Sequence, residues 1–544
     1  MSSSLRFFEL FIKKILELER GVAGRSRWDN NSKMDTNLSL LCLLFSVLFS
    51  AYMFNITRST ITIGGEVSSI DELIYSSAVS VAWLGVSWVI LISVIKRTRI
   101  HSTVPLPWFG STALLGIISS FIMLFLVEWL FDVLVISMRW DIVWANRVSV
   151  MLGPNLTEAM TQDYLVSENW RIWPIIFLLW AIVGSAYGTS GTSTKSYLIG
   201  FGVVTAIILA FAGNPLEANY NIDRVLFRFY LAIALSLFCF FTMRYYSNHV
   251  EEYKVNRARR YIGYAGISTF FLTIFLLDPP EFIKNFAANL VGFGIFESQL
   301  ELITRDGVPP ARWGGLLINL IVAAAGCVLG FAIGVVLAFS RQSTLPILKW
   351  PGIAVIEIVR SGPLICWLYF AMYLLPDVAD PLFTNPEDFD NIVRMMAIFS
   401  LFGGCYIAEV IRGGLQAVDS GQKEAALALG LSPIQIKLQI ELPNAVRTTL
   451  PSIVSVFIGL WKDTTLLFII EIVDFFRISK TMANTDLRFL GDFLEPVYFT
   501  ALIFWVFAFY LSRVSMNVEK GLGLVKEGGG DLSLIHISEP TRPY

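Results

Sequence analysis

Twelve long apolar runs constrain the fold of this chain more than any other feature. They fall at residues 38–55, 73–95, 108–138, 170–187, 197–213, 225–243, 261–277, 314–339, 351–375, 392–415, 448–470 and 498–512. A helix of such residues can cross a hydrocarbon layer of about 30 Å. The runs lack the alternating pattern of barrel strands, and a spanning segment must satisfy its own backbone hydrogen bonds. The sequence therefore predicts an all-α membrane protein with about twelve transmembrane helices.

The charges between the runs predict an orientation. One set of alternate segments, which includes 1–37, 416–447 and 513–527, holds 24 Lys and Arg against 12 acidic residues. The other set holds 11 basic against 24 acidic residues. Basic loops stay on the cytoplasmic side, so we expect both termini in the cytoplasm. Because residues 1–37 are polar and of mixed charge, we expect no removable signal peptide.

The most informative polar segment is 424–443, between two of the runs. Its first six residues favour a helix, and Gly430 is the residue type that most readily ends a helix in the left-handed conformation. Ser432 then offers an N-cap and Pro433 fits a first helical turn. We expect two short helices joined at a glycine corner, the second running towards Pro443. An ordinary amphipathic surface loop is the alternative.

The order of residues in this segment resembles the EAA motif of ABC importer permeases. The matching positions are Glu424, Ala425, Ala426, Gly430, Ile440, Leu442 and Pro443. The flanks at 406–422 and 462–467 resemble the polar amino acid branch of that family. Upstream, residues 359–364 depart from the usual R-G-x-P-L pattern of the branch, because Ser361 and Gly362 are interchanged.

The resemblance implies a permease subunit of a bacterial inner membrane importer for polar or general L-amino acids. It implies a five-helix type I ABC importer permease core at 314–527, whose loop transmits closure of an ATPase dimer. The implied partners are that ATPase, a homologous second permease, a periplasmic amino-acid-binding protein and membrane lipid. ATP and Mg would be bound by the ATPase, since this chain has no Gly-Lys dipeptide and hence no P-loop. We expect no enzyme activity, cofactor, metal or nucleic acid on the chain itself.

Three regions are expected. Residues 1–313 form an extension with about seven spans, similar to the N-terminal extensions of general L-amino acid permeases through 141–147 and 168–174. Residues 314–527 carry all the family motifs. The tail at 528–544 looks like translated cloning adapter, and we expect it to be non-native read-through.

Charges inside the runs mark candidate sites, since each costs about 2.5–3.5 kcal/mol at mid-bilayer unless it is paired or hydrated. Two pairs, Glu357 with Arg360 and Glu409 with Arg412, have helical i,i+3 spacing near the inner ends of their runs. We interpret them as candidate gating ion pairs. Snorkelling of these side chains to the membrane interface is the alternative.

Lys462 and Asp463 lie well inside the run 448–470, and Thr464 follows them. An adjacent cation and anion could complement the two charged groups of an amino acid, so these residues are candidates for the substrate pathway. A purely structural ion pair is the alternative.

A strip of Gly326, Gly330, Gly334 and Ala338 recurs every four positions in the run 314–339. It predicts close helix packing within the subunit, or else a surface that slides against the second permease.

Two other functions remain open from the residues. Glu128 and Asp132 share a helical face and, with Lys462, could line the ion path of a secondary transporter or channel. An ABC importer permease for another small solute is the second alternative.

Overall fold

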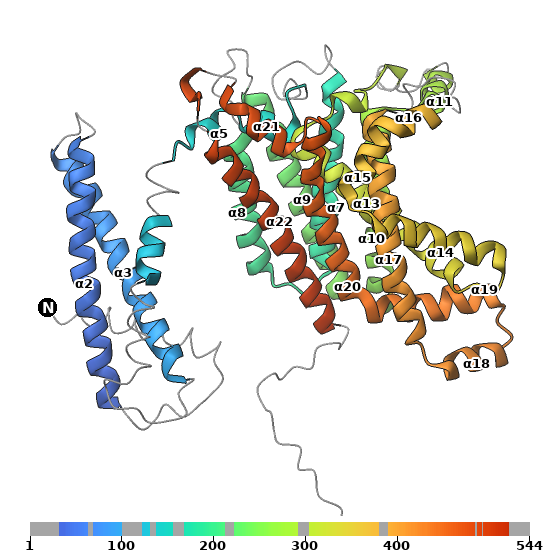
Figure 1. Cartoon of the computed structure of the whole chain (residues 1–544), viewed down its shortest axis with the longest axis horizontal. Helices are drawn as coiled ribbons and strands as arrows, with labels where there is room; N and C mark the ends of the chain where they lie inside the picture. Colours follow the sequence, from blue (N-terminus) through green and yellow to red (C-terminus); the bar gives the residue numbers. More distant parts are fainter. Residues whose placement is uncertain are drawn as a thin grey trace, which may run out of the picture. The chain divides into compact units, whose positions relative to one another are not determined.

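The computed structural model describes residues 32–63, 69–100, 122–130, 138–155, 168–212, 222–291, 304–379, 390–484, 487–491 and 493–521. Among these residues the chain is helical and has no strand, apart from one isolated bridge between Gly315 and Asp474 (Figure 1). The described residues form two compact units, one up to residue 138 and one from residue 139 onward.

The first unit contains the helices α2 (Ser32–Ile63) and α3 (Ser69–Ile100), together with a helical segment at 122–130. Helices α2 and α3 pack against each other through Ser50, whose hydroxyl donates to the carbonyl of Ser80 at 2.7 Å. Phe49 stacks edge-on against Trp83 beside this contact. Small polar residues at such contacts let two membrane helices approach closely.

The second unit begins with helices that belong to the predicted extension. They are α5 (Asp141–Ala145), α6 (Arg147–Leu152), η3 (Glu168–Arg171), α7 (Ile172–Thr189), α8 (Thr194–Ala212), α9 (Ile222–His249), α10 (Glu252–Leu277), α11 (Glu281–Val291) and η4 (Pro310–Arg312). Gly184 and Gly188 bring α7 against α9, because a Cβ there would lie 2.2 Å from the Ser236 carbonyl oxygen and 2.6 Å from that of Phe240.

The rest of the second unit carries the family motifs. Its elements are α13 (Gly315–Arg341), α14 (Pro346–Ser361), α15 (Leu364–Tyr369), η5 (Phe370–Leu374), α16 (Leu375–Ala379), α17 (Asn391–Gln416), α18 (Ser420–Ala428), α19 (Pro433–Gln435), η8 (Ile436–Glu441), α20 (Leu442–Asp463), η9 (Thr464–Ile470), α21 (Phe475–Thr481), η10 (Met482–Asn484), η11 (Leu487–Phe489) and α22 (Leu494–Gly521).

Helices α13 and α17 form the most extensive helix pair of the unit, and the predicted glycine strip lies between them. A Cβ on Gly330 would lie 3.1 Å from the Ser400 carbonyl oxygen, and one on Gly334 would lie 2.8 Å from Ile407. On α17, Gly404 lies opposite these two glycines. The strip therefore packs within this chain, which favours the first of its two interpretations.

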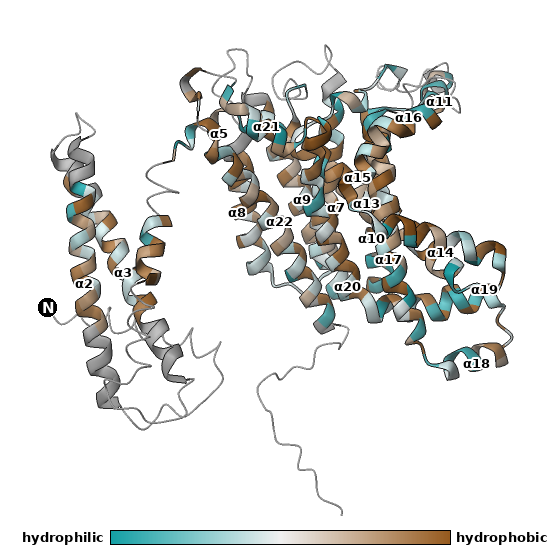
Figure 2. Cartoon of the chain, in the orientation of Figure 1, coloured by the Kyte–Doolittle hydropathy of each residue, from teal (hydrophilic) through white to brown (hydrophobic). Residues whose placement is uncertain are grey.

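Seven helices among the described residues are long and apolar enough to cross a membrane, and one bent pair would make eight. Three further apolar segments, Cys42–Arg58, Ser76–Leu91 and Thr194–Leu209, fall in α2, α3 and α8. Most predicted runs thus coincide with helices, and the chain is an all-α, multi-pass membrane protein (Figure 2). The run 108–138 lies largely outside the described residues, so the count of twelve stays a prediction.

The sequence predicts the run 351–375 as one straight span, but the structure bends it. Helix α14 and the stretch Leu364–Val378, which begins with α15, meet at an angle of 107°. Gly362 and Pro363 are both extended, because proline disfavours a helical conformation in the residue before it and has no N–H of its own. Across the bend, the Trp367 indole donates to the Val359 carbonyl at 3.0 Å.

The two halves of the second unit share one hydrophobic core. Ile172 and Leu277 belong to the same buried cluster as Trp313, Ile318 and Leu460. The boundary near residue 313, predicted from composition and motifs, therefore lies within a compact unit, and the units divide instead at residues 138 and 139. The domain assignment by motif content stays a prediction.

Arg171 links the beginning of α7 to the end of α10 and to the segment that precedes α13. Its buried guanidinium donates to the carbonyls of Leu276 at 3.2 Å and Arg305 at 3.0 Å. The N–H of Val308 donates to the Leu277 carbonyl at 2.7 Å, close to the start of α13. The beginnings of α7 and α13 and the end of α10 therefore lie together.

A Gly404→Ala substitution tests the α13–α17 contact. The new Cβ would lie 2.8 Å from Ile333 and 3.1 Å from the Gly330 carbonyl oxygen, so the helices must separate. We expect a loss of about 1–3 kcal/mol in the free energy of unfolding, measured as a lower thermal midpoint in detergent. Gly413→Ala on the same helix is the control, since nothing lies within 4 Å of its Cβ. Equal midpoints for both variants would contradict the close contact.

Candidate functional site

The two-helix corner, which we define as α18, Gly430 and α19, projects from one end of the bundle (Figure 1). Helix α18 begins where the Asp419 carboxylate accepts a hydrogen bond from the Gly421 N–H at 3.0 Å. It ends at Gly430, which has a φ of 77°. There the Leu431 N–H donates to the Ala426 carbonyl at 3.2 Å, which closes the helix in a Schellman-type turn. The predicted left-handed glycine corner is present.

The second arm of the corner begins as predicted but continues much further. Ser432 and Gln435 form a reciprocal capping box, with Pro433 in the first turn. The chain then passes through the π-helical turn η8 directly into α20, so Pro433–Ile470 forms one continuous stretch. Pro443 lacks an N–H and its ring crowds the preceding turn, which accounts for the widened turn before it. The expectation of a separate short helix ending near Pro443 is therefore wrong.

Polar contacts tie α18 to the start of α20. Lys423 forms an ion pair with Glu441 at 3.1 Å, and the Asn444 amide donates to the Gln422 side-chain oxygen at 2.8 Å. Ala426 packs inward and is only 4% exposed. The corner is thus fixed to the helix that follows it, so the two can move as one body.

The residues of the EAA-like motif differ in how far they are exposed. Glu424, Ala425, Gly430 and Pro443 are exposed, Ile440 and Leu442 are half-buried, and Ala426 is buried. Four large aliphatic side chains of the corner and of the adjoining η8 are also exposed: Leu427 at 59%, Leu429 at 82%, Ile434 at 70% and Leu438 at 52%. Exposed aliphatic groups gathered in a polar loop indicate a surface that another protein covers.

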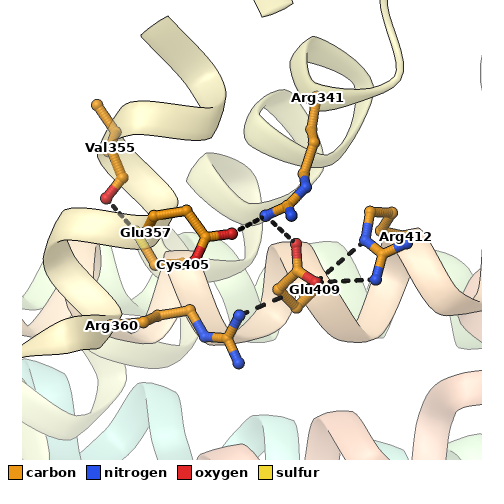
Figure 3. A network of polar contacts seen from close by, with 7 residues as sticks. All are labelled: Arg341, Val355, Glu357, Arg360, Cys405, Glu409 and Arg412. Atoms are coloured by element: carbon orange, nitrogen blue, oxygen red, sulfur yellow. Dashed lines mark hydrogen bonds and ion pairs between the residues drawn. The ribbon is translucent and has the colours of Figure 1, made fainter. Parts of the chain in front are cut away.

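A second polar feature is a network of two glutamates and three arginines, which joins α13, α14 and α17 (Figure 3). Glu409 of α17 lies at its centre and is in contact with Arg341 at 2.7 Å, Arg412 at 3.0 Å and Arg360 at 3.9 Å. Arg341, the last residue of α13, also contacts Glu357 of α14 at 2.8 Å. Three helix ends are therefore held by one half-buried carboxylate.

The network differs from the pairing that the sequence predicted. Glu409 and Arg412 do pair within α17, at i,i+3 spacing. Glu357 and Arg360, however, pair with Arg341 and Glu409 on other helices. The bend between α14 and α15 leaves both residues free to face α13 and α17. A gating role for these four residues stays a prediction.

The three candidate pathway residues do not face one common space. Lys462 is exposed, Asp463 is half-buried and Thr464 is fully buried. The Thr464 hydroxyl accepts a hydrogen bond from the Asn319 amide at 3.1 Å and donates to the Trp461 carbonyl at 2.8 Å. Thr464 thus has a structural role in this conformation, and the substrate role of all three residues stays a prediction.

Asn319 is an important residue that the sequence interpretation missed. Its amide nitrogen donates to Thr464 and to the Asp474 carboxylate, while its oxygen accepts from the Phe475 N–H at 2.9 Å. It thereby links α13 to the residue that directly follows α20 and to the beginning of α21. A lone amide inside the apolar run 314–339 was the available signal. Arg341 was missed because it lies just beyond that run.

The residues of the ion-path alternative are described only in part. Glu128 is half-buried in the helical segment of the first unit. Asp132 lies outside the described residues.

Comparisons with known proteins match the region that contains this site. The family described as "Binding-protein-dependent transport system inner membrane component" matches residues 330–523. The permease protein BztC of Rhodobacter capsulatus, named for glutamate, glutamine, aspartate and asparagine transport, is 41% identical over 39% of this chain and 48% of its own length. The amino-acid ABC transporter permease YhdY of Escherichia coli is 38% identical over 40% of this chain and 57% of its own length. The alignments thus cover about half of each of these two relatives.

A shorter relative is covered almost completely. The glutamate/aspartate import permease GltK of Escherichia coli is 31% identical over 36% of this chain and 87% of its own length. A solved structure titled "Crystal structure of an amino acid ABC transporter with histidines" aligns at 24% identity over 38% of this chain and 92% of that chain, with a TM-score of 0.33. With the family match and the coverage of GltK, this chain belongs to the family of binding-protein-dependent transport system inner membrane components.

Proposed function

We propose that this chain is the membrane permease subunit of an ATP-driven importer of polar or general L-amino acids. Its relatives are named as amino-acid transport permeases, and their alignments cover about 40% of this chain or less. The observation that carries the proposal is the exposed two-helix corner, which runs without interruption into the membrane helix α20. A displacement of this surface by a bound partner would therefore be transmitted directly to α20.

The partner that pushes is a separate ATPase dimer, which holds ATP and Mg. This chain has no P-loop sequence of its own. Closure of the dimer would shift α18 and α19, and the contacts Lys423–Glu441 and Gln422–Asn444 would carry that shift into α20. A soluble corner docked on this ATPase lies in the cytoplasm, as does each terminus in the orientation expected from charge.

The network around Glu409 offers a second route into the membrane. It links the end of α13 with α14 and α17, next to the loop that leads to α18. A displacement of α17 would change these ion pairs and so the positions of three helices. The homologous second permease completes the pathway, and a periplasmic amino-acid-binding protein delivers the substrate, for which Lys462, Asp463 and Thr464 are candidate contacts.

Reconstitution tests the function as a whole. The chain is placed in liposomes with an ABC ATPase, a second permease and a periplasmic amino-acid-binding protein from the same organism, and uptake of radiolabelled amino acids is measured. We expect uptake that requires ATP and the binding protein. Uptake by this chain alone, driven by a proton or sodium gradient, would instead establish an ion-coupled carrier. Uptake of a sugar, peptide or metal but of no amino acid would be consistent with an ABC importer and would overturn the proposed substrate class.

A Gly430→Val substitution tests the corner. A valine at a φ of 77° is strained, so the angle between α18 and α19 should change while no neighbouring atom is displaced. In the reconstituted complex we expect normal recognition of the binding protein, but ATP hydrolysis at least about tenfold less coupled to uptake. Gly421→Val in α18 is the control, because its Cβ makes only ordinary contact, 3.6 Å from the Asp419 side chain. Normal coupling in the Gly430 variant would remove the corner from the mechanism.

A pair of matched substitutions tests the network. Glu409→Gln leaves three arginines with one carboxylate, and its side chain is 16% exposed. We expect it to lower the free energy of unfolding by about 1–3 kcal/mol and to reduce transport. Glu357→Gln changes a carboxylate that is 56% exposed and has one partner, so its effect should be about 0–1 kcal/mol. Thermal midpoints and uptake rates measure both, and equal effects would mean that Glu409 is not the centre of the network.

A further inference from the structure

A groove of about 380 Å³ runs between the end of α7 and the first half of α10. Its lining includes Thr189, Ser190, Arg259, Gly263 and Gly266. Most of this lining is apolar, and its polar groups gather where α7 ends. None of these residues belongs to the two-helix corner or to the arginine–glutamate network.

Two arginines mark the polar end of the groove. Arg259 donates from Nε to the Thr189 carbonyl at 3.1 Å and from Nη1 to the Asn256 side-chain oxygen at 3.1 Å. Arg244 donates to the Ser190 carbonyl at 2.9 Å. All of these acceptors are neutral, and neither arginine forms an ion pair within the described part of the chain. The end of α7 orients both guanidinium groups without neutralising either by a carboxylate.

The surrounding segment is strongly basic. Residues 244–260 contain Arg244, Lys254, Arg257, Arg259 and Arg260. The acids of the segment are Glu251 and Glu252, and Glu251 pairs with Lys254 at 3.5 Å on an exposed surface. A net charge of about +3 therefore remains beside the groove, enough to attract an anion to its polar end.

The groove lies at the end of the bundle that carries the two-helix corner. The beginnings of α7 and α13 and the end of α10 meet through Arg171 and the Val308–Leu277 hydrogen bond. The end of α7 and the beginning of α10 therefore lie at the opposite end, as does the end of α13. Within a membrane, this places the polar end of the groove at headgroup level on the side of the corner.

The floor of the groove is open along α10. A Cβ on Gly263 or Gly266 would meet no atom within 4 Å. Tyr261, Tyr264 and Ile267 around these glycines are 51–63% exposed, as expected for side chains that face lipid. The two glycines thus leave an apolar channel along α10 that continues from the basic end of the groove.

We propose that this groove binds one anionic phospholipid. The phosphate lies against Arg259 and Arg244, and one acyl chain occupies the channel over Gly263 and Gly266. Charge complementarity selects an anion, and the apolar floor selects an anion with a hydrocarbon chain over a soluble one. The site would make the stability of α7, α9 and α10 depend on the lipid composition, independently of the transported substrate.

The test uses the full chain, purified with its bound lipid after exchange into a mixture of equal parts phosphatidylglycerol and phosphatidylcholine. Native mass spectrometry measures the ratio of the two lipids retained. We expect an excess of phosphatidylglycerol that millimolar inorganic phosphate does not displace. No excess in the unmodified chain, or an excess that phosphate removes, would overturn the proposal.

Two variants locate the lipid. Arg259→Gln should lower the phosphatidylglycerol excess about fivefold, and Arg259→Lys should restore most of it. Gly263→Leu with Gly266→Leu fills the channel without touching a hydrogen bond, so it should abolish retention even if Arg259→Gln disturbs folding. The control is Gly200→Leu with Gly202→Leu on α8, where the added Cβ atoms also meet open space. An equal loss in the control, or no loss in the filled groove, would contradict this location.

Discussion

The close contact between α13 and α17 determines the arrangement of the rest of the second unit. Lipid tails are as apolar as the side chains they surround, so membrane helices associate through close van der Waals contact rather than through the hydrophobic effect. Gly330, Gly334 and Gly404 allow that contact by bringing the two backbones together. Since the two helices are fixed along their length, their ends are fixed as well. Arg341 and Glu409 meet only because of this packing.

The corner and the network are two consequences of helices that end at the same side of the bundle. The corner is stiff because its second arm is part of the stretch that contains α20, and its first arm is held to that helix by Lys423 and Gln422. The network is compact because one carboxylate serves three arginines. An input at the corner can therefore reach α13, α14, α17 and α20 without passing through a loose segment, which is the physical basis of the proposed coupling.

Residues 139–313 contribute to the same core as the family region. Ile172 and Leu277 share a buried cluster with Ile318, and Arg171 donates hydrogen bonds to the backbone carbonyls of Leu276 and Arg305. On α5 and α6, Ile142 and Val150 pack into a second cluster with Phe475. These residues are part of the structure that supports α13 and α21. Residues 139–313 therefore form one core with the family region, although they carry no family motif.

The sequence alone determined what depends on neighbouring residues. The length of most apolar runs predicted a helix, Gly430 predicted the left-handed corner, and Ser432 with Pro433 predicted the following helix start. These features follow from backbone conformation and hydrogen bonds within a few residues.

The tertiary structure alone decided what depends on where distant segments meet. It turned the run 351–375 through 107°, gave Glu357 and Arg360 partners on other helices, and placed Asn319 between α20 and α21. It also continued the second arm of the corner through Pro443 into α20. The physical reason is that an ion pair or a buried amide acquires its partner from the packing of whole helices, and the spacing of residues along one helix does not specify that packing.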